Sequence, residues 1–194
     1  MSVPDLAPQI GPSSLEGRDA GSAATAPRVQ AEMLVVFRAP AGHLGHLAHE
    51  QGPSWRLACH AGMHPHTLVL QNIERLGLRA LVVHSTSWRL EADQLLLTYL
   101  VAVRAQRRWP DPLRPIPTSA PRRLTQGSAT AAPERLVADD VLVHALRHLA
   151  WLYFDDAAVK QALGPRWRAG LRPYLPAPFM ALTRRPSRNP RPGR

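Results

Sequence analysis

Two apolar runs separated by a short polar break constrain the fold of this chain more than any other feature. They lie in residues 78–105, LRALVVHSTSWRLEADQLLLTYLVAVRA, where the break is the tripeptide EAD. The stretch is rich in valine, threonine, tryptophan and tyrosine, which favour β-strands, and its layout predicts an antiparallel hairpin. Because the second run is apolar at nearly every position, we expect it to be a central strand covered on both faces.

Alternation in the first arm of the hairpin predicts which side chains share a face. Successive residues of a strand point to opposite sides of a sheet. We therefore expect His84, Thr86 and Trp88 to lie together on one face, with smaller or polar residues on the other. Ser85 would then point away from His84, which argues against the simplest serine hydrolase arrangement.

Shorter patterns before the hairpin predict further elements. EMLVVFRAP, residues 32–40, is an apolar run that ends at a proline and is typical of a buried strand. AGHLGHLAHE, residues 41–50, predicts a short helix that its two glycines weaken. WRLAC, residues 55–59, predicts a second strand.

HTLVLQNIERLG, residues 66–77, is the most regular helical pattern before the hairpin. At about 100° per residue, Val69, Ile73 and Leu76 fall on one narrow arc. Pro65 suits the first turn of this helix, and Gly77 suits the left-handed residue that commonly ends one.

A second amphipathic helix is predicted in VLVHALRHLAWLYFDD, residues 141–156, and GPRWRAGLRPYL restarts a helix after it. One side of the first helix is apolar and is expected to pack on the sheet. The opposite side carries Asp140, His144, Arg147, His148 and Trp151.

This polar side of the helix has three interpretations: a metal site, a solvated surface or a docking face. A histidine pair at i, i+4 has the spacing of a metal chelate, and Asp140 would be the third ligand. Tryptophan and arginine are enriched at protein interfaces, so Trp151 among polar residues favours docking. We predict a partner-docking face of His144, Arg147, His148 and Trp151, and no metal.

Charge and composition predict one α+β domain with additional segments at both ends. Residues 104–123 and 184–194 each carry a net charge of +5, which together equals the formal net charge of +10. We predict a disordered segment at 1–30, a single domain at 31–182 with a flexible Pro/Arg-rich linker at about 105–133, and a disordered basic tail at 183–194. The sheet is expected to be mixed or antiparallel and flanked by helices.

Several classes of protein are excluded by what the sequence lacks. The single cysteine, Cys59, excludes an internal disulfide framework, and the start of the chain does not resemble a signal peptide. The longest apolar runs reach about nine residues, whereas a membrane-spanning helix needs roughly 20. We expect a cytoplasmic protein without membrane contact. Lys160 is the only lysine among 24 basic residues, which suggests a GC-rich, bacterial genome.

Other candidate site residues are histidines and aromatic residues near the predicted helix and hairpin. His60, His64 and His66 flank Pro65 in a loop, where functional residues are common. We predict His64, His66 and Trp88 as ligand-binding residues, and His84 either as a half-buried side chain or as a pocket residue. The sequence contains no P-loop, GxGxxG or GxSxG motif.

The order of these elements resembles the Nudix hydrolase domain over about 75 residues from Met33 and the helix near Val141. In that family the helix carries the box REUxEExGU, with U a bulky aliphatic residue, whose glutamates hold Mg²⁺ against a diphosphate. When Gly77 and Leu78 are aligned with the end of the box, Glu74 falls on one acidic position. The remaining positions carry Leu70, Gln71, Asn72 and Arg75. The resemblance implies a degenerate box that has lost its usual metal chemistry.

These observations favour a non-catalytic binding or interaction module, with a protein partner or self-association and no resident cofactor. One alternative is a divergent phosphohydrolase that uses Mg²⁺ on a nucleoside diphosphate-type substrate, with Glu74 and His84 as catalytic candidates. Another is sequence-independent nucleic-acid binding through the Arg-rich linker and tail, which would weaken steeply with salt.

Overall fold

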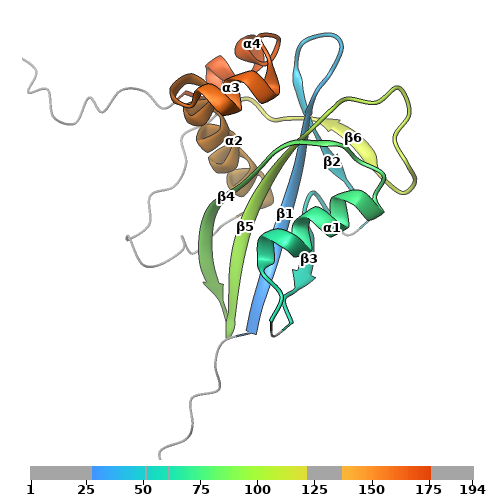
Figure 1. Ribbon diagram of the computed structural model, residues 1–194, viewed down its shortest axis with the longest axis vertical. Coiled ribbons are helices and arrows are strands. Elements are labelled where there is room, and N and C mark those ends of the chain that lie inside the picture. The colour runs from blue at the N-terminus through green and yellow to red at the C-terminus, as the bar shows by residue number, and fades with distance from the viewer. Residues whose placement is uncertain (1–27, 51, 61, 122–136, 176–194) are drawn as a thin grey trace, which may run out of the picture.

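The chain folds into a mixed six-stranded sheet with helices on both faces, which confirms the predicted α+β class (Figure 1). The computed structural model describes residues 28–50, 52–60, 62–121 and 137–175. The strands are β1 (Arg28–Arg38), β2 (Leu44–Ala48), β3 (Trp55–Ala58), β4 (Ala80–Glu91), β5 (Gln94–Val103) and β6 (Arg114–Pro117). The helices are α1 (Pro65–Arg75), α2 (Ala138–Asp155), α3 (Ala157–Leu163), α4 (Trp167–Leu171) and the 3-10 turn η1 (Arg172–Tyr174).

Strand β1 is the centre of the sheet, whose order is β4-β5-β1-β2-β6. It runs parallel to β5, with Phe37 opposite Val103, and antiparallel to β2. Strand β3 pairs with the first half of β1, on the same edge that β2 uses further along. This central position explains the continuous apolar run of β1, because a strand covered on both faces buries every side chain.

The two faces of the sheet have separate hydrophobic cores. Leu34 and Val36 of β1 pack under α2, α3 and α4, on what we call the α2 face. Met33 and Val35 point to the opposite side, the α1 face, where α1 and the segment after β5 cover them. Alternation along the strands therefore decides which layer each side chain meets.

The predicted hairpin is confirmed as β4 and β5, but its first arm does not alternate regularly. The pairing register shifts between Ser85 and Ser87, so that the extra residue forms a β-bulge. His84 consequently lies opposite Leu100 on the α2 face, whereas Trp88 lies opposite Leu97 on the α1 face. The prediction that His84 and Trp88 share a face is wrong.

The helix predicted for residues 41–50 is also wrong, because this segment contains the strand β2. Gly45 lies directly against the ring of Phe37, and a Cβ atom there would clash with the ring carbon Cζ. Pairing with β1 buries Leu44 and Leu47, a gain that outweighs the weak local preference for a helix. The predicted strands at 32–40 and 55–59 and the helix at 66–77 are confirmed, and Gly77 has a φ of 64° as its end requires.

The flexible linker predicted at 105–133 is wrong for its first part. Residues 114–117 form β6, an edge strand on β2 in which prolines are tolerated because their missing N–H groups face outward. Trp109 packs on Phe37 with ring centroids 4.7 Å apart, and Leu113 is buried. Residues 122–136 lie outside the described residues.

The predicted terminal segments lie largely outside the described residues. Residues 28–30, assigned to the N-terminal segment, instead begin β1. The helix expected in GPRWRAGLRPYL is present as α4. Among the described residues, no helix combines the length and apolar character needed to cross a membrane.

Candidate functional site

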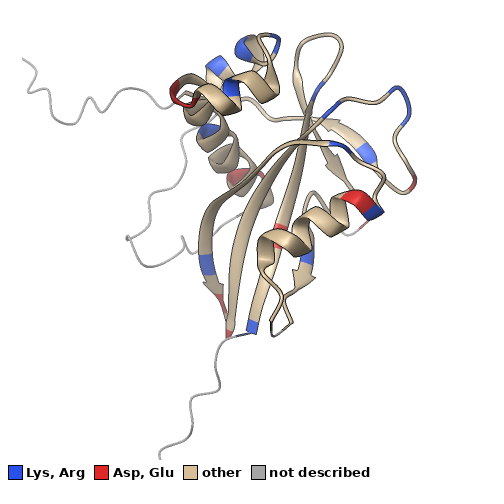
Figure 2. Cartoon of the chain, viewed as in Figure 1, with Lys and Arg blue, Asp and Glu red and all other residues tan. Residues whose placement is uncertain are grey.

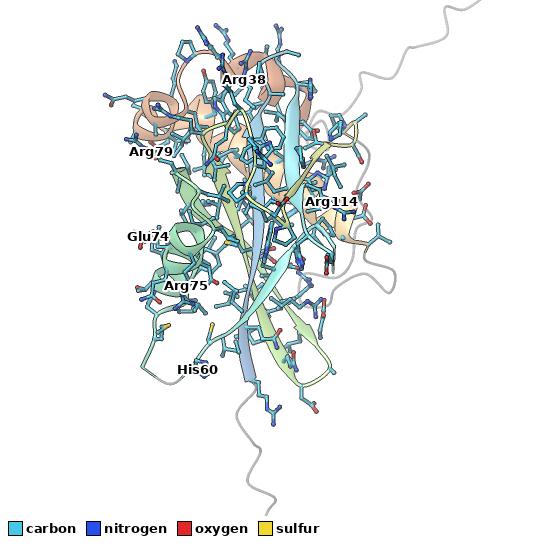
Figure 3. All side chains as sticks on the ribbon, turned by 90° about the vertical axis from the view of Figure 1, so that its right-hand side faces the viewer. Arg38, His60, Glu74, Arg75, Arg79 and Arg114 are labelled. Atoms are coloured by element: carbon cyan, nitrogen blue, oxygen red, sulfur yellow. The ribbon has the colours of Figure 1, made fainter. Side chains whose placement is uncertain are left out.

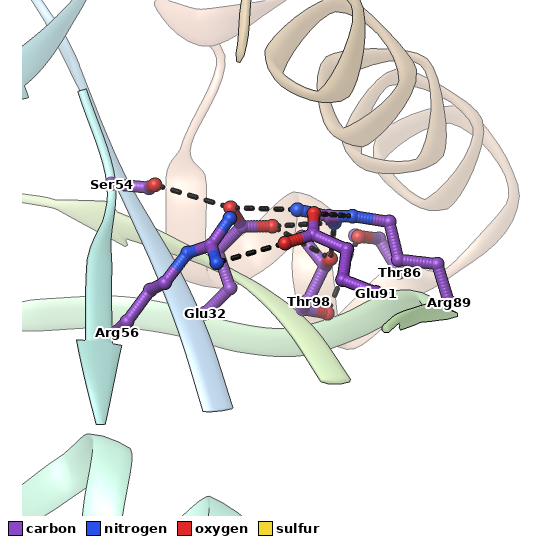
Figure 4. Close-up of polar contacts among 7 residues, drawn as sticks. All are labelled: Glu32, Ser54, Arg56, Thr86, Arg89, Glu91 and Thr98. Atoms are coloured by element: carbon purple, nitrogen blue, oxygen red, sulfur yellow. Dashed lines mark hydrogen bonds and ion pairs between the residues drawn. The ribbon is translucent and has the colours of Figure 1, made fainter. Parts of the chain in front are cut away.

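A buried ion pair lies at the first half of β1, on the α2 face (Figure 4). Glu32 is 4% exposed and directly precedes the apolar residues 33–37 of β1. Arg89 of β4 reaches it with two nitrogens, Nη1 to Oε2 at 2.7 Å and Nη2 to Oε1 at 3.0 Å. This paired geometry is the strongest that a guanidinium and a carboxylate form.

Two hydroxyl groups complete the surroundings of Glu32. Ser54 donates to Oε1 and Thr98 donates to Oε2, both at 3.1 Å. Thr98 is fully buried in β5, so its hydroxyl group is held against the carboxylate. With two hydrogen bonds on each oxygen, Glu32 is fully occupied by neighbours within the chain.

The network continues outward through Glu91, the last residue of β4. Arg89 Nε donates to its Oε1 and Arg56 Nη1 donates to its Oε2, each at 2.8 Å. Burial raises the pKa of Glu91, but the hydrogen bonds and charges of Arg89 and Arg56 outweigh it and the pKa is lowered. Burial lowers the pKa of Arg89. The hydrogen bonds and charges of Glu32 and Glu91 outweigh this effect, so the pKa of Arg89 is raised.

These residues line a pocket of about 380 Å³ beneath the first turn of α2, which we call the paired pocket. Its two arginines, Arg56 and Arg89, are matched by two carboxylates, Glu32 and Glu91. The network joins four strands, and because its charges are already balanced it suits a structural role. Sequence reasoning missed it, although a glutamate inside the apolar run EMLVVF was a usable signal.

Three half-buried histidines form a second cluster on the α2 face. The rings of His144 and His148 on α2 have centroids 4.7 Å apart, and the ring of His84 on β4 lies 6.4 Å from that of His148. Burial is the main cause that lowers the pKa of each ring. Nearby positive charge lowers two of these pKa values further. Arg147 lowers the pKa of His144, and His144 and His84 lower the pKa of His148.

The orientation of this cluster differs from that expected for the predicted docking face. His144 and His148 turn toward β4, and His144 also bonds to the backbone of Thr86, so neither side chain points straight into solvent. Of the residues predicted to dock a partner, Trp151 is exposed at 52%. Phe154, which the sequence did not single out, lies one turn further on α2 and is 40% exposed. The outward part of α2 is therefore aromatic.

The predicted catalytic candidates do not meet. Glu74 is exposed near the end of α1 (Figure 3). His84 lies on the opposite side of the sheet. His60 is exposed at the far end of the molecule from Arg38 in the same view. No group of three His, Cys, Asp or Glu side chains in the described ranges is arranged to hold a metal ion.

The predicted ligand-binding residues are only partly brought together. His64 caps α1, where its Nδ1 accepts a hydrogen bond of 3.2 Å from the His66 N–H. The ring of His66 lies 6.2 Å from that of Tyr99 on β5. Trp88 lies on the same face of the sheet and is 60% exposed. The basic residues of the tail, 184–194, fall outside the described residues.

Comparisons with known proteins give a distant structural similarity. No family model and no curated protein matches the sequence. The chain is similar to the solved structure described as "Crystal structure of putative nudix hydrolase family member from Chromobacterium violaceum", at 14% sequence identity and a TM-score of 0.42. The similarity covers 70% of this chain and 86% of that one. A likeness of this degree assigns neither an activity nor a ligand, and the degenerate box remains a prediction.

Proposed function

We propose that this chain is a non-catalytic interaction module that presents the outward face of α2 to a protein partner. The observation that carries the proposal is the exposure of two large aromatic side chains on one helix, Trp151 at 52% and Phe154 at 40%. They are three residues apart and so lie on neighbouring positions of the helix surface. Aromatic residues are enriched at the centres of protein interfaces.

The rest of α2 supports this role because it holds the face rigid. Leu142, Leu146, Leu149 and Tyr153 are buried against the sheet, and the hydroxyl group of Tyr153 donates to the carbonyl of Gly164 at 3.2 Å. The ring of Phe154 packs edge-on against Tyr153 with centroids 5.2 Å apart. A face that is ordered before binding loses less conformational entropy when a partner arrives.

Binding rather than catalysis is supported by the positions of the carboxylates. Glu32 has both oxygens occupied by Arg89, Ser54 and Thr98. Glu74 and His84 lie on opposite sides of the sheet, so one substrate atom would not reach both. An interaction role does not require a catalytic function from these side chains.

A photo-crosslinking residue placed at position 151 and, separately, at position 88 tests the proposal. Trp88 is the matched control, because it is equally large and exposed but lies on the α1 face. We expect a defined partner to crosslink from position 151 and not from position 88. Once that partner is purified, Trp151→Ala should weaken its binding by about tenfold or more, as for an aromatic hot spot.

Sedimentation velocity on the same variants covers the case in which the partner is a second copy. Equal behaviour of Trp151→Ala and Trp88→Ala in both measurements would contradict the docking face. Turnover of a nucleoside diphosphate compound that requires Mg²⁺ and is abolished by Glu74→Gln would replace the proposal with the hydrolase alternative.

A further inference from the structure

Two buried strands end in an arginine at the same edge of the sheet. Strands β1 and β5 are parallel, and Phe37 lies opposite Val103 at their carboxyl ends. The next residues are Arg38 and Arg104, which by alternation both belong to the α2 face. Figure 2 shows basic residues at this end of the sheet on β1, on the segment after β5 and on α4.

A third arginine comes from the helical layer. Arg166 lies in the turn between α3 and α4, and together with Arg38 and Arg104 it lines a pocket of about 360 Å³, which we call the arginine pocket. The remaining lining side chains are apolar or small: Leu81, Val103, Ala105, Ala162, Leu163, Gly164, Pro165 and Trp167. Among the described residues, the pocket wall thus carries three positive charges and no carboxylate.

None of these three arginines forms an ion pair with a carboxylate of the described residues. The Nε atom of Arg38 is buried and has no hydrogen-bond partner within the described part of the chain. A buried donor without a partner is costly, and the cost is larger when the group is charged. The neighbouring cations of Arg104 and Arg166 add to that cost, since like charges in one pocket repel.

We propose that the arginine pocket binds the phosphoryl group of a small phosphorylated ligand. A planar guanidinium matches the oxygens of a phosphate, and it forms its strongest hydrogen bonds with charged acceptors. Three cations suit a dianionic phosphoryl group better than a single carboxylate. Arg38, Arg104 and Arg166 supply the donors for the phosphoryl oxygens, and the apolar lining leaves room for the group that carries the phosphate.

This site is independent of the docking face of α2. The arginine pocket lies at the carboxyl ends of β1 and β5 and beside the α3–α4 turn, and neither Trp151 nor Phe154 lines it. One of the two proposals can therefore fail while the other holds.

Titration of the full chain with inorganic phosphate and with phenyl phosphate tests the proposal, followed by calorimetry and by the ³¹P signal of the ligand. We expect saturable binding that weakens by about tenfold in Arg38→Met and in Arg104→Gln, as loss of a charge-assisted contact implies. Arg79→Gln is the matched control, because Arg79 is exposed near Arg104 but does not line the pocket (Figure 3). It should change the affinity less than twofold, as a rim charge does.

Arg104→Gln keeps the test valid if Arg38→Met folds poorly, because Arg104 is exposed. Three outcomes would overturn the proposal. They are binding that does not saturate, an equal loss in Arg79→Gln and Arg104→Gln, which indicates a general basic surface, and tighter binding of benzoate than of phenyl phosphate, which indicates a carboxylate site.

Discussion

At the two ends of β1, on the same face of the sheet, a partly buried arginine has opposite surroundings. Near the start of the strand, Arg89 lies in the paired pocket with Glu32 and Glu91 as partners. Arg38 lies six residues after Glu32 in β1, or about 20 Å at the rise of a strand. It lines the arginine pocket and has no carboxylate partner among the residues that the structure describes. Both residues are arginines. They differ in the charged side chains that neighbouring strands place beside them.

This contrast separates a structural role from a binding role. Where the fold pairs two buried charges, removal of one partner lowers stability because the other charge is left buried and uncompensated. A charge that the fold leaves without a counter-charge costs stability, which a ligand restores when it binds. Substitutions in the paired pocket should therefore change the free energy of unfolding. Substitutions in the arginine pocket should change the affinity for a ligand.

The largest effect is expected for Arg89→Met, which leaves Glu32 buried without its two strongest hydrogen bonds. We expect a loss of roughly 3–5 kcal/mol in the free energy of unfolding, as for a broken buried ion pair. Urea unfolding followed by circular dichroism measures it. A loss no larger than that of the exposed control Arg75→Met would show that the network does not stabilise the fold.

A smaller loss is expected for Thr98→Val, which keeps the shape of the side chain but removes its hydroxyl group. Thr98 is fully buried, donates to Glu32 and accepts from Arg89 Nη1 at 3.1 Å. The free energy of unfolding should fall by about 1–3 kcal/mol, the cost of groups left unsatisfied in a buried site. If the double variant with Arg89→Met loses only as much as Arg89→Met alone, the two residues act through one network.

Acid should distinguish the two pockets, because only the paired pocket holds carboxylates. The folded state lowers the pKa of Glu91 below its ordinary value of 4.5, so its contribution to stability is present above that value and is lost as pH falls through the lower folded pKa. The contribution is under about 1 kcal/mol, since Glu91 is partly exposed and screened.

The melting temperature of Glu91→Gln, followed from pH 7 down to about pH 3, measures this contribution. The gap between wild type and variant should close on acidification. A gap that is constant with pH would show that Glu91 acts through packing rather than charge.

The smallest effect on stability is expected for Arg38→Met, which keeps most of the apolar stem and removes a charge that has no ion pair in the described ranges. The free energy of unfolding should change by no more than about 0.5 kcal/mol, or should rise. Measured beside Arg89→Met in the same urea titration, it compares one substitution in two surroundings. A loss of the same size at both positions would remove the distinction between the two pockets.

The sequence predicted well those elements whose pattern is local. The amphipathic period and terminal glycine of α1, and the two arms of the hairpin, can be read from neighbouring residues. The sequence-based prediction was wrong at Gly45, where contact with Phe37 favours a strand over the expected helix. It was also wrong at Thr86, where a bulge moves Trp88 to the other face of the sheet. In both cases the deciding contact comes from another strand.

The candidate sites were the least predictable part, because their members are far apart in the chain. Glu32 and Arg89 are 57 residues apart, and nothing in either neighbourhood indicates the other. Arg38 and Arg104 each follow an apolar run, in VVFR and VAVR, but these runs form one pocket only because β1 and β5 pair in parallel. Helix α2 lay between these extremes: the sequence placed Trp151 on its outward side, while the orientation of His144 and His148 depended on β4.

By itself, the sequence determined the class of fold and most of its elements, because hydrophobic period and turn residues act over a few positions and bias the backbone directly. The tertiary structure alone decided which charges have partners. That outcome depends on strand order, register and one bulge, which are set by the burial of whole faces rather than by any local preference.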